Sequence, residues 1–266
     1  MKKNNPYLPN HSAATKTTDF IFGIHPILEA LDAGKELDKI LLQQNFITHA
    51  LLRSIHERAL EAGIPVSKVP TERLNRVTRK NHQGVIAFLA SVGFASLDHV
   101  ISEAFGAGRA PLILLLDGIT DVRNFGAIVR TAECTGVDAV VVGGKSAARI
   151  GEDAVKTSAG ALHLVPIVRS PQLQKTAEFL QHSGLQLIAC TEKTKTTLFE
   201  QALDLALPTV IVMGSEEKGI DPSILKIADG QARIPLLGKI ESLNVSVAAG
   251  VLLYEAVRQR KKAHSK

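Results

Sequence analysis

Three short segments of the chain combine polar side chains with glycine in patterns that can do chemistry. They read NFGAIVRTA at residues 124–132, MGSEEKG at 213–219 and ESLNVSVA at 241–248. The guanidinium of Arg130 is a rigid fork of five donors that suits a phosphate. Gly214 follows an apolar run typical of a strand, and glycine there lets main-chain atoms approach a ligand closely. The segments therefore indicate a site for a phosphate group and for a ligand recognised through the backbone.

Each segment also has a purely structural interpretation. Arg130 lies off the apolar stripe of its predicted helix, which is typical of a solvated surface arginine. Asn124, Ser242 and Asn244 belong to residue types that cap helix N-termini through their side-chain oxygens. Glu216 has the position of an ordinary acidic residue in the first turn of a helix. The residue types alone leave both interpretations open.

Taken together and in this order, the three segments resemble the motifs of the SpoU (TrmH-like) family of RNA ribose 2′-O-methyltransferases, within the SPOUT superfamily. The resemblance covers about residues 112–258 and implies a catalytic set of Asn124, Arg130, Glu216, Ser242 and Asn244. It implies that Arg130 contacts RNA phosphate and helps to deprotonate the ribose 2′-hydroxyl. The family pattern Gly-x-Glu-x-x-Gly assigns the functional carboxylate to Glu216.

The resemblance also implies S-adenosylmethionine as the methyl donor and no metal. Main-chain groups of Gly214, Ile234 and Leu243 are expected to receive the cofactor, with Thr191 at its rim. Side-chain chemistry alone assigns Ile234 and Leu243 to the core. The last helix, predicted to run to about residue 257, is apolar nearly all round, so it lies either in a large core or against a second subunit. The family's homodimer favours the second subunit.

The N-terminal part of the chain carries a second resemblance. Its segments FGIHPILEA at 22–30 and NHQGV at 81–85 are similar to the substrate-binding domain of the ribosomal, RlmB-type branch, which has a ribosomal-protein-like α/β fold. The most basic local cluster there is predicted to contact RNA phosphates: Arg76, Arg79, Lys80 and His82. Such contacts position RNA without reading its sequence.

This second resemblance implies that the target is a guanosine of 23S rRNA. One alternative is a guanosine of tRNA, although tRNA-directed members often lack such a domain. Another is a non-catalytic RNA-binding paralogue, which the intact motif residues disfavour.

The apolar pattern predicts an α/β fold of two domains. We expect a flexible arm at 1–18, an RNA-binding domain at 19–94, a linker at 95–110 and a methyltransferase domain at 111–266. Continuous apolar runs predict strands at 111–116, 139–142, 164–168, 185–189, 209–213 and 231–236, as in a parallel sheet covered by helices on both faces. The family resemblance adds a trefoil knot in the C-terminal part of this sheet.

The composition excludes several other classes of protein. The two cysteines, Cys134 and Cys190, form no Cys-x-x-Cys pair, which argues against a zinc ribbon or a disulfide scaffold and favours a reducing compartment. The net charge of +5 is compatible with RNA. No apolar run approaches the ~20 residues of a membrane span, and the polar start lacks the core of a signal peptide, so we expect a cytoplasmic protein. The P-loop-like residues 144–146 lack the first glycine, because Ala139 stands in its place.

Overall fold

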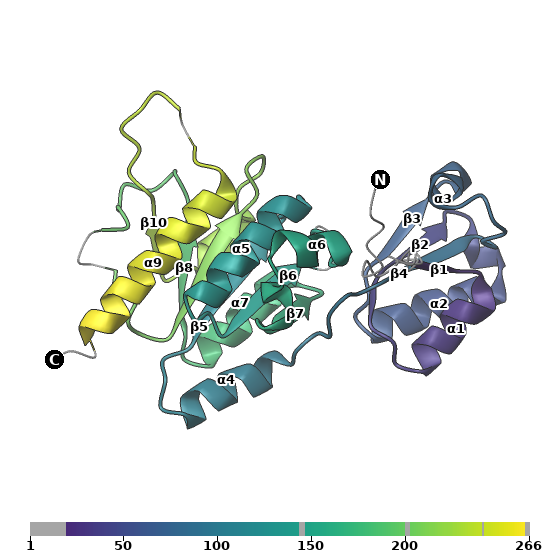
Figure 1. Cartoon of the computed structure of the whole chain (residues 1–266), viewed down its shortest axis with the longest axis horizontal. Coiled ribbons are helices and arrows are strands. Elements are labelled where there is room, and N and C mark those ends of the chain that lie inside the picture. Colours follow the sequence, from purple (N-terminus) through teal and green to yellow (C-terminus); the bar gives the residue numbers. More distant parts are fainter. Residues whose placement is uncertain (1–19, 144–146, 200–202, 241, 264–266) are drawn as a thin grey trace, which may run out of the picture.

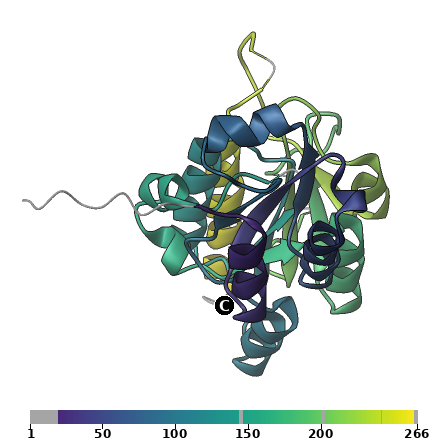
Figure 2. The same ribbon diagram turned by 90° about the vertical axis from the view of Figure 1, so that its right-hand side faces the viewer.

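The computed structural model describes residues 20–143, 147–199, 203–240 and 242–263. These residues form two α/β domains, a small N-terminal one and a large C-terminal one (Figure 1). Figure 2 shows the small domain in front of the large one. The predicted arm at 1–18 and the P-loop-like residues 144–146 lie outside the described residues.

The small domain contains a mixed four-stranded sheet of order β1-β4-β2-β3. Its strands are β1 (Phe20–Phe22), β2 (Leu37–Gln43), β3 (Val66–Val69) and β4 (Val85–Leu89). Strand β4 is antiparallel to β1 and β2, whereas β3 is parallel to β2. Side chains alternate along β4, so Val85 and Ala87 pack under the helices α1 (Ile24–Asp32) and α2 (Ala50–Glu61). Ile86 faces the opposite side, where the short helix α3 (Thr71–Val77) packs through Leu74.

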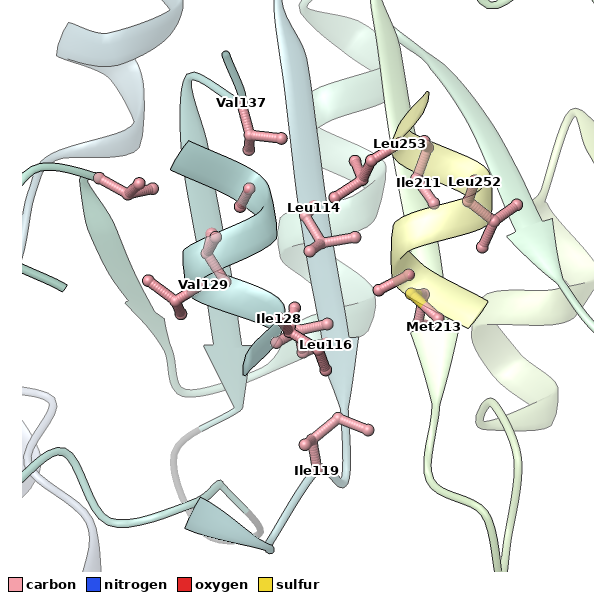
Figure 3. Packing of buried hydrophobic residues seen from close by; sticks show 14 of the residues in the cluster. Leu114, Leu116, Ile119, Ile128, Val129, Val137, Ile211, Met213, Leu252 and Leu253 are labelled. Carbon is pink, nitrogen blue, oxygen red and sulfur yellow. The ribbon is translucent and has the colours of Figure 1, made fainter. Parts of the chain in front are cut away.

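The large domain contains six parallel strands in the order β10-β8-β9-β5-β6-β7. They are β5 (Leu112–Asp117), β6 (Ala139–Gly143), β7 (Ile167–Ser170), β8 (Gln186–Cys190), β9 (Thr209–Gly214) and β10 (Gly230–Ala232). Leu114 and Leu116 point to the face covered by the helices α5 (Val122–Cys134), α6 (Glu152–Thr157) and α9 (Val245–Ala263) (Figure 3). Ile113 and Leu115 point to the face covered by α4 (Leu97–Gly106), α7 (Leu173–His182) and α8 (Pro222–Ile227). Burial on both faces explains the continuous apolar strands in the sequence.

Several predicted boundaries were wrong. The strand expected at 164–168 begins at Ile167, because Ala161–His163 forms a 3-10 turn and leaves Leu164 exposed. The last strand ends at Ala232 rather than at 236, and β1 and α6 were not predicted. Helix α4 falls inside the segment expected to be a linker, yet Leu97, Val100 and Ile101 are buried against the large sheet. That helix therefore belongs to the core of the large domain.

The two domains meet at a polar junction around Arg169. Its guanidinium donates to the carbonyl oxygens of Leu37 at 2.8 Å and Asp38 at 3.1 Å, and lies 3.7 Å from the ring centroid of Phe94. The carboxylate of Asp38 accepts a hydrogen bond from the backbone N–H of Ile150 at 3.3 Å. Both charged side chains are about nine-tenths buried. Burial raises the pKa of Asp38, against the opposing effects of the Ile150 hydrogen bond and the Arg169 charge. The junction thus ties the small domain to the large one through buried polar contacts.

Within the described residues, no helix has both the length and the apolar character that crossing a membrane requires.

Candidate active site

Two cavities open at the carboxyl ends of the central strands of the large sheet, where parallel α/β sheets bind ligands. The β8–β9 cavity, of about 490 Å³, lies between the segment that follows β8 and the turn that follows β9. The β5–β9 cavity, of about 540 Å³, lies between that same turn and the segment that follows β5. Residues 215–220 and Val245 line both cavities. One turn therefore separates two ligand-sized spaces.

The turn after β9 folds back tightly onto the end of its strand. The N–H of Gly219 donates to the carbonyl of Ser215 at 2.8 Å, and Gly219 adopts a φ of 69°. A Cβ at Gly214 would stand 2.1 Å from the carbonyl carbon of Gly219. Only glycine fits at Gly214, so the return of the chain depends on the absence of a side chain there.

Glu216, at the tip of this turn, binds the start of α9. Its Oε1 accepts the backbone N–H of Val245 at 3.0 Å and the side-chain Nδ2 of Asn244 at 3.3 Å. Asn244 caps the helix, because its Oδ1 accepts the backbone N–H of Ser246 at 2.9 Å. Free N–H groups at a helix N-terminus need acceptors, and the Glu216 side chain supplies one here.

Asn124 completes this polar cluster from the first turn of α5. Its Oδ1 accepts a hydrogen bond from Nδ2 of Asn244 at 3.0 Å. The predicted alternative, that Asn124 caps its helix, was wrong, because Asp121 is the N-cap and accepts the N–H of Asn124 at 2.8 Å. An Asp just before the first residue of the helix is an ordinary sequence signal for a cap. With the cap supplied by Asp121, the amide of Asn124 is available to the site.

The β5–β9 cavity is strongly acidic. Its lining includes one lysine and five carboxylate side chains: Asp117, Asp121, Glu216, Glu217 and Asp221. Asp117 accepts the N–H of Asp221 at 2.7 Å, while its partial burial and the Asp221 charge raise the pKa of Asp117. Phosphates are repelled from such a cavity, whereas a neutral sugar or a base with N–H groups is compatible with it.

The β8–β9 cavity brings together the residues predicted to bind the cofactor. Gly214, Ile234, Leu243 and Thr191 all line it. Ser242, predicted to be catalytic, lines the same cavity, as does Glu216.

Cys190, which sequence reasoning did not select, also lines the β8–β9 cavity. Burial, with a smaller effect of the Glu192 charge, raises the pKa of its thiol to about 11. This thiol therefore stays protonated at neutral pH.

Arg130 is the predicted catalytic residue that the single chain does not bring to the cluster. It is exposed and lines neither cavity. Arg130 is the sixth residue after Asn124. On an α-helix this spacing places the two residues about 9 Å apart along the axis and about 120° apart around it. The next residue, Thr131, lies 4.0 Å from the position of a Cβ on Gly250, so Arg130 stands beside the contact between α5 and α9.

The basic cluster predicted to contact RNA divides into two groups. Arg76, Arg79 and Lys80 are exposed. His82 is only 8% exposed, and its Nδ1 accepts the N–H of Gly84 at 3.0 Å while its Nε2 lies 3.0 Å from Oδ1 of Asn75. Both ring nitrogens therefore have partners within the small domain, and the ring stabilises the turn before β4. The structure therefore removes His82 from the predicted phosphate contacts.

Comparison with known families gives the class of protein. Residues 111–254 match the model of the SpoU rRNA Methylase family, and residues 20–94 match a model described as RNA 2′-O ribose methyltransferase substrate binding. The chain belongs to the SpoU rRNA Methylase family. It is thus an RNA 2′-O-ribose methyltransferase with an N-terminal substrate-binding domain and a tRNA or rRNA target.

Individual relatives agree with this class. The uncharacterised tRNA/rRNA methyltransferase slr0955 of Synechocystis is 37% identical over 93% of this chain, which spans 64% of that longer relative. YacO of Bacillus subtilis, named for the TrmH family of tRNA/rRNA methyltransferases, is 30% identical over 91% of this chain and 96% of its own length. The SpoU methyltransferase AviRb of Streptomyces viridochromogenes, solved in complex with AdoMet, has the same fold. Its TM-score is 0.57 and its identity 24%, over 91% of this chain and 90% of AviRb.

Proposed function

We propose that this enzyme transfers a methyl group from S-adenosylmethionine to the ribose 2′-hydroxyl of a guanosine in 23S rRNA. The observation that carries the proposal is the shared wall between the two cavities. Glu216 lines both, and it is joined through Asn244 to Asn124 on the far side of the turn. In this proposal the β8–β9 cavity holds the cofactor and the β5–β9 cavity receives the target nucleoside.

The β8–β9 cavity fits the cofactor in volume and in the character of its lining. Its 490 Å³ lies within the range of small-molecule sites. Gly214, Ile234 and Leu243 offer main-chain groups, and Thr191 offers a hydroxyl at the edge. When bound, S-adenosylmethionine supplies a methyl group on a sulfonium that is already electrophilic. The chain must therefore align the ribose 2′-oxygen with that methyl group and allow the 2′-hydroxyl to lose its proton.

Two atoms of the polar cluster are suited to the ribose hydroxyl. Among the described residues, the Nδ2 of Asn124 and the Oε2 of Glu216 have no recorded hydrogen-bond partner. One is a donor and the other an acceptor, so together they can orient a hydroxyl group. We assign this orientation to Asn124 and Glu216, which Asn244 holds in place through its hydrogen bonds, while Ser242 acts from the lining of the β8–β9 cavity.

Arg130 is assigned to a phosphate of the RNA. A guanidinium keeps its proton in proteins, so it acts by binding and charge rather than as a base. The acidic lining of the β5–β9 cavity excludes phosphates, so a phosphate contact belongs outside that cavity, as the exposed position of Arg130 requires.

A homodimer supplies the surface that α9 leaves uncovered. Of the two positions expected for this helix, complete burial in the core of the single chain does not hold. Ala249, Leu252 and Leu253 are buried, whereas Val247 is 52% and Tyr254 56% exposed. We propose that this exposed apolar face packs against a second copy, so that Arg130, at the edge of the face, meets groups that the single chain does not provide.

The choice of 23S rRNA rests on the small domain. We propose that residues 19–94 bind the substrate RNA and that 111–266, together with α4, form the methyltransferase domain. A tRNA guanosine is the second candidate, since both relatives are named for tRNA/rRNA methylation. The trefoil knot stays a prediction.

Ribose-methylation mapping of total RNA from cells with and without the gene tests the proposal. We expect one 2′-O-methyl group to disappear from 23S rRNA and to return with the wild-type chain but not with Arg130→Ala. A loss confined to tRNA would support the methyltransferase activity and contradict the choice of 23S rRNA as the target. Unchanged methylation in both RNAs would overturn the catalytic assignment and favour a binding paralogue.

A further inference from the structure

We propose that Phe20, Phe22 and Phe88 form an aromatic surface on which unstacked bases of the substrate RNA stack before the strand enters the β5–β9 cavity. We call these three residues the aromatic surface. The inference rests on the proposed function, because it takes RNA as the substrate, and it adds single-stranded RNA beside the target nucleotide as the ligand.

The three rings lie together on one face of the small sheet. Phe20 and Phe22 are two residues apart on β1 and so point to the same side. Phe88 is the direct cross-strand partner of Phe20. The ring centroids of Phe20 and Phe22 are 6.2 Å apart, and those of Phe20 and Phe88 are 6.1 Å apart. All three side chains are partly exposed.

The helices of the small domain leave this part of the sheet open. Helices α1 and α2 cover the opposite face. On the face of the aromatic surface, Leu74 of α3 is buried in a cluster with residues of β2, β3 and β4, and the three rings pack against this cluster while staying partly exposed. The rings are therefore partly buried at the border of this cluster and partly accessible from solvent.

Cations lie over two of the three rings. Nζ of Lys80 is 6.0 Å from the centroid of Phe22, and Cζ of Arg149 is 4.4 Å from the centroid of Phe88. The exposed Arg76 and Arg79 lie on the same segment as Lys80. Aromatic rings flanked by basic side chains are the combination that binds single-stranded nucleic acid, with bases on the rings and phosphates on the cations.

The aromatic surface is connected to the candidate active site through Arg149. This arginine belongs to the large domain and lies over the ring of Phe88 in the small one, so the large domain places a cation against the aromatic surface. Its neighbour Ala148 donates a hydrogen bond of 2.7 Å to the carbonyl of Ile119, which lines the β5–β9 cavity. A strand stacked on the aromatic surface would therefore pass Arg149 and reach the edge of that cavity.

Leucine substitutions test the inference, because leucine keeps an apolar side chain while removing the stacking face. The variants are Phe22→Leu and Phe88→Leu, and the matched control is Phe105→Leu, on an exposed phenylalanine of α4 in the large domain. Each full-length variant is titrated against a short fluorescein-labelled single-stranded RNA and against the same sequence as a duplex. We expect the first two variants to lose about tenfold in affinity for the single strand and little for the duplex, as loss of one stacked base predicts. Phe22→Tyr should bind like the wild type.

Equal single-strand affinity in all three leucine variants would overturn the inference and leave the rings as core packing alone. If Phe22→Leu or Phe88→Leu unfolds, ultraviolet crosslinking of the wild-type chain to the same RNA decides instead. Crosslinks at residues 20–22 or 88 support the surface, and crosslinks confined to other segments overturn it. Methyl transfer is measured separately, so a chain that binds RNA through the aromatic surface without methylating it would sink the proposed function and leave this inference standing.

Discussion

Asn244, which caps α9, donates a hydrogen bond of 3.0 Å to Asn124 in the first turn of α5, 120 residues earlier in the chain. The same Nδ2 lies 3.3 Å from Oε1 of Glu216. Each of the three polar motifs contributes one side chain to this cluster. Helix starts are suited to such convergence, because their free N–H groups and caps bring polar atoms to one place.

The two asparagines should differ in what their removal costs. Asn244→Ala removes a helix cap, so we expect a loss of about 1 kcal/mol in the free energy of unfolding together with a loss of activity. Asn124→Ala removes an amide that caps nothing, so stability should change little while single-turnover methyl transfer falls by about a hundredfold or more. Chemical denaturation and transfer kinetics on both variants check this. Equal destabilisation by the two substitutions would contradict the assigned roles.

Arg130→Ala should leave cofactor binding unchanged and abolish methyl transfer, because Arg130 lines neither cavity but is assigned to RNA phosphate. Arg123→Ala, on another exposed arginine of α5, is the control and should retain activity. Calorimetric titration with S-adenosylmethionine and a methyl-transfer assay give the two readouts. Turnover like that of the wild type in Arg130→Ala would refute the catalytic assignment.

The homodimer makes a separate prediction about the exposed face of α9. Tyr254→Glu places a charge on a half-exposed apolar site, so we expect the chain to sediment as a monomer and to lose methyl transfer while keeping its helical content. Analytical ultracentrifugation measures the mass. A wild-type chain that is already monomeric at the concentrations used for the assay would exclude the dimer.

Gly214→Ala should disrupt the turn after β9, because the added Cβ would stand 2.1 Å from the carbonyl carbon of Gly219. We expect a loss of about 1–3 kcal/mol or more in stability and much weaker cofactor binding. Gly238→Ala is the matched control, since nothing lies within 4 Å of its added Cβ. Normal cofactor affinity in Gly214→Ala would show that the turn is not part of the cofactor site.

The buried Asp38 should give the domain junction a measurable pH dependence. Burial raises the pKa of Asp38 above its ordinary 3.8, so between these two values the folded chain holds a proton that the unfolded chain has lost. Stability contributed by Asp38 is therefore greatest at low pH and falls as the pH rises through this window. Arg169, Arg149 and Lys39 oppose the shift without cancelling it. The difference in unfolding free energy between wild type and Asp38→Asn should decrease with rising pH, and a difference that increases would contradict the raised pKa.

The two cysteines should react at very different rates with iodoacetamide. Cys134 is exposed, whereas the pKa of Cys190 is raised to about 11, which leaves ~0.1% thiolate at pH 8. Mass spectrometry after brief alkylation should find the label on Cys134 alone. Equal labelling of both residues would mean that the β8–β9 cavity is more open and polar than the structure shows.

The sequence predicted the large parallel sheet, and several of its predicted site residues line the two cavities, because those features leave local signals. Buried strands leave apolar runs, and Gly214, Glu216 and Asn244 stand in short motifs beside helix and strand ends. His82 was misassigned because a buried, hydrogen-bonded imidazole has the same sequence appearance as an exposed one. The extent of the last strand was overestimated because the apolar Ile234 and Leu236 line a cavity rather than a sheet.

The domain junction left no local signal in the sequence. Arg169 lies 131 residues from Asp38, and its two donors bind carbonyl oxygens, which every residue carries. No pattern in either segment marks such a contact. Arg130 and Asn124 stand in one motif, yet they lie on different sides of α5. The residue spacing on a helix predicts this separation, whereas membership of a common motif does not.

Recognition of Leu37 and Asp38 through their carbonyl oxygens also bears on how such enzymes diversify. The two hydrogen bonds from Arg169 reach main-chain atoms and so do not select the side chains at positions 37 and 38, although Leu37 is fixed separately by its burial in the core of the small domain. Exposed residues of the small domain can therefore drift while its attachment persists. Exchange of one RNA-binding module for another then requires a strand that presents two carbonyls in the same place and a carboxylate for the N–H of Ile150. The junction would therefore allow a different RNA-binding domain to be attached without changes to the methyltransferase domain.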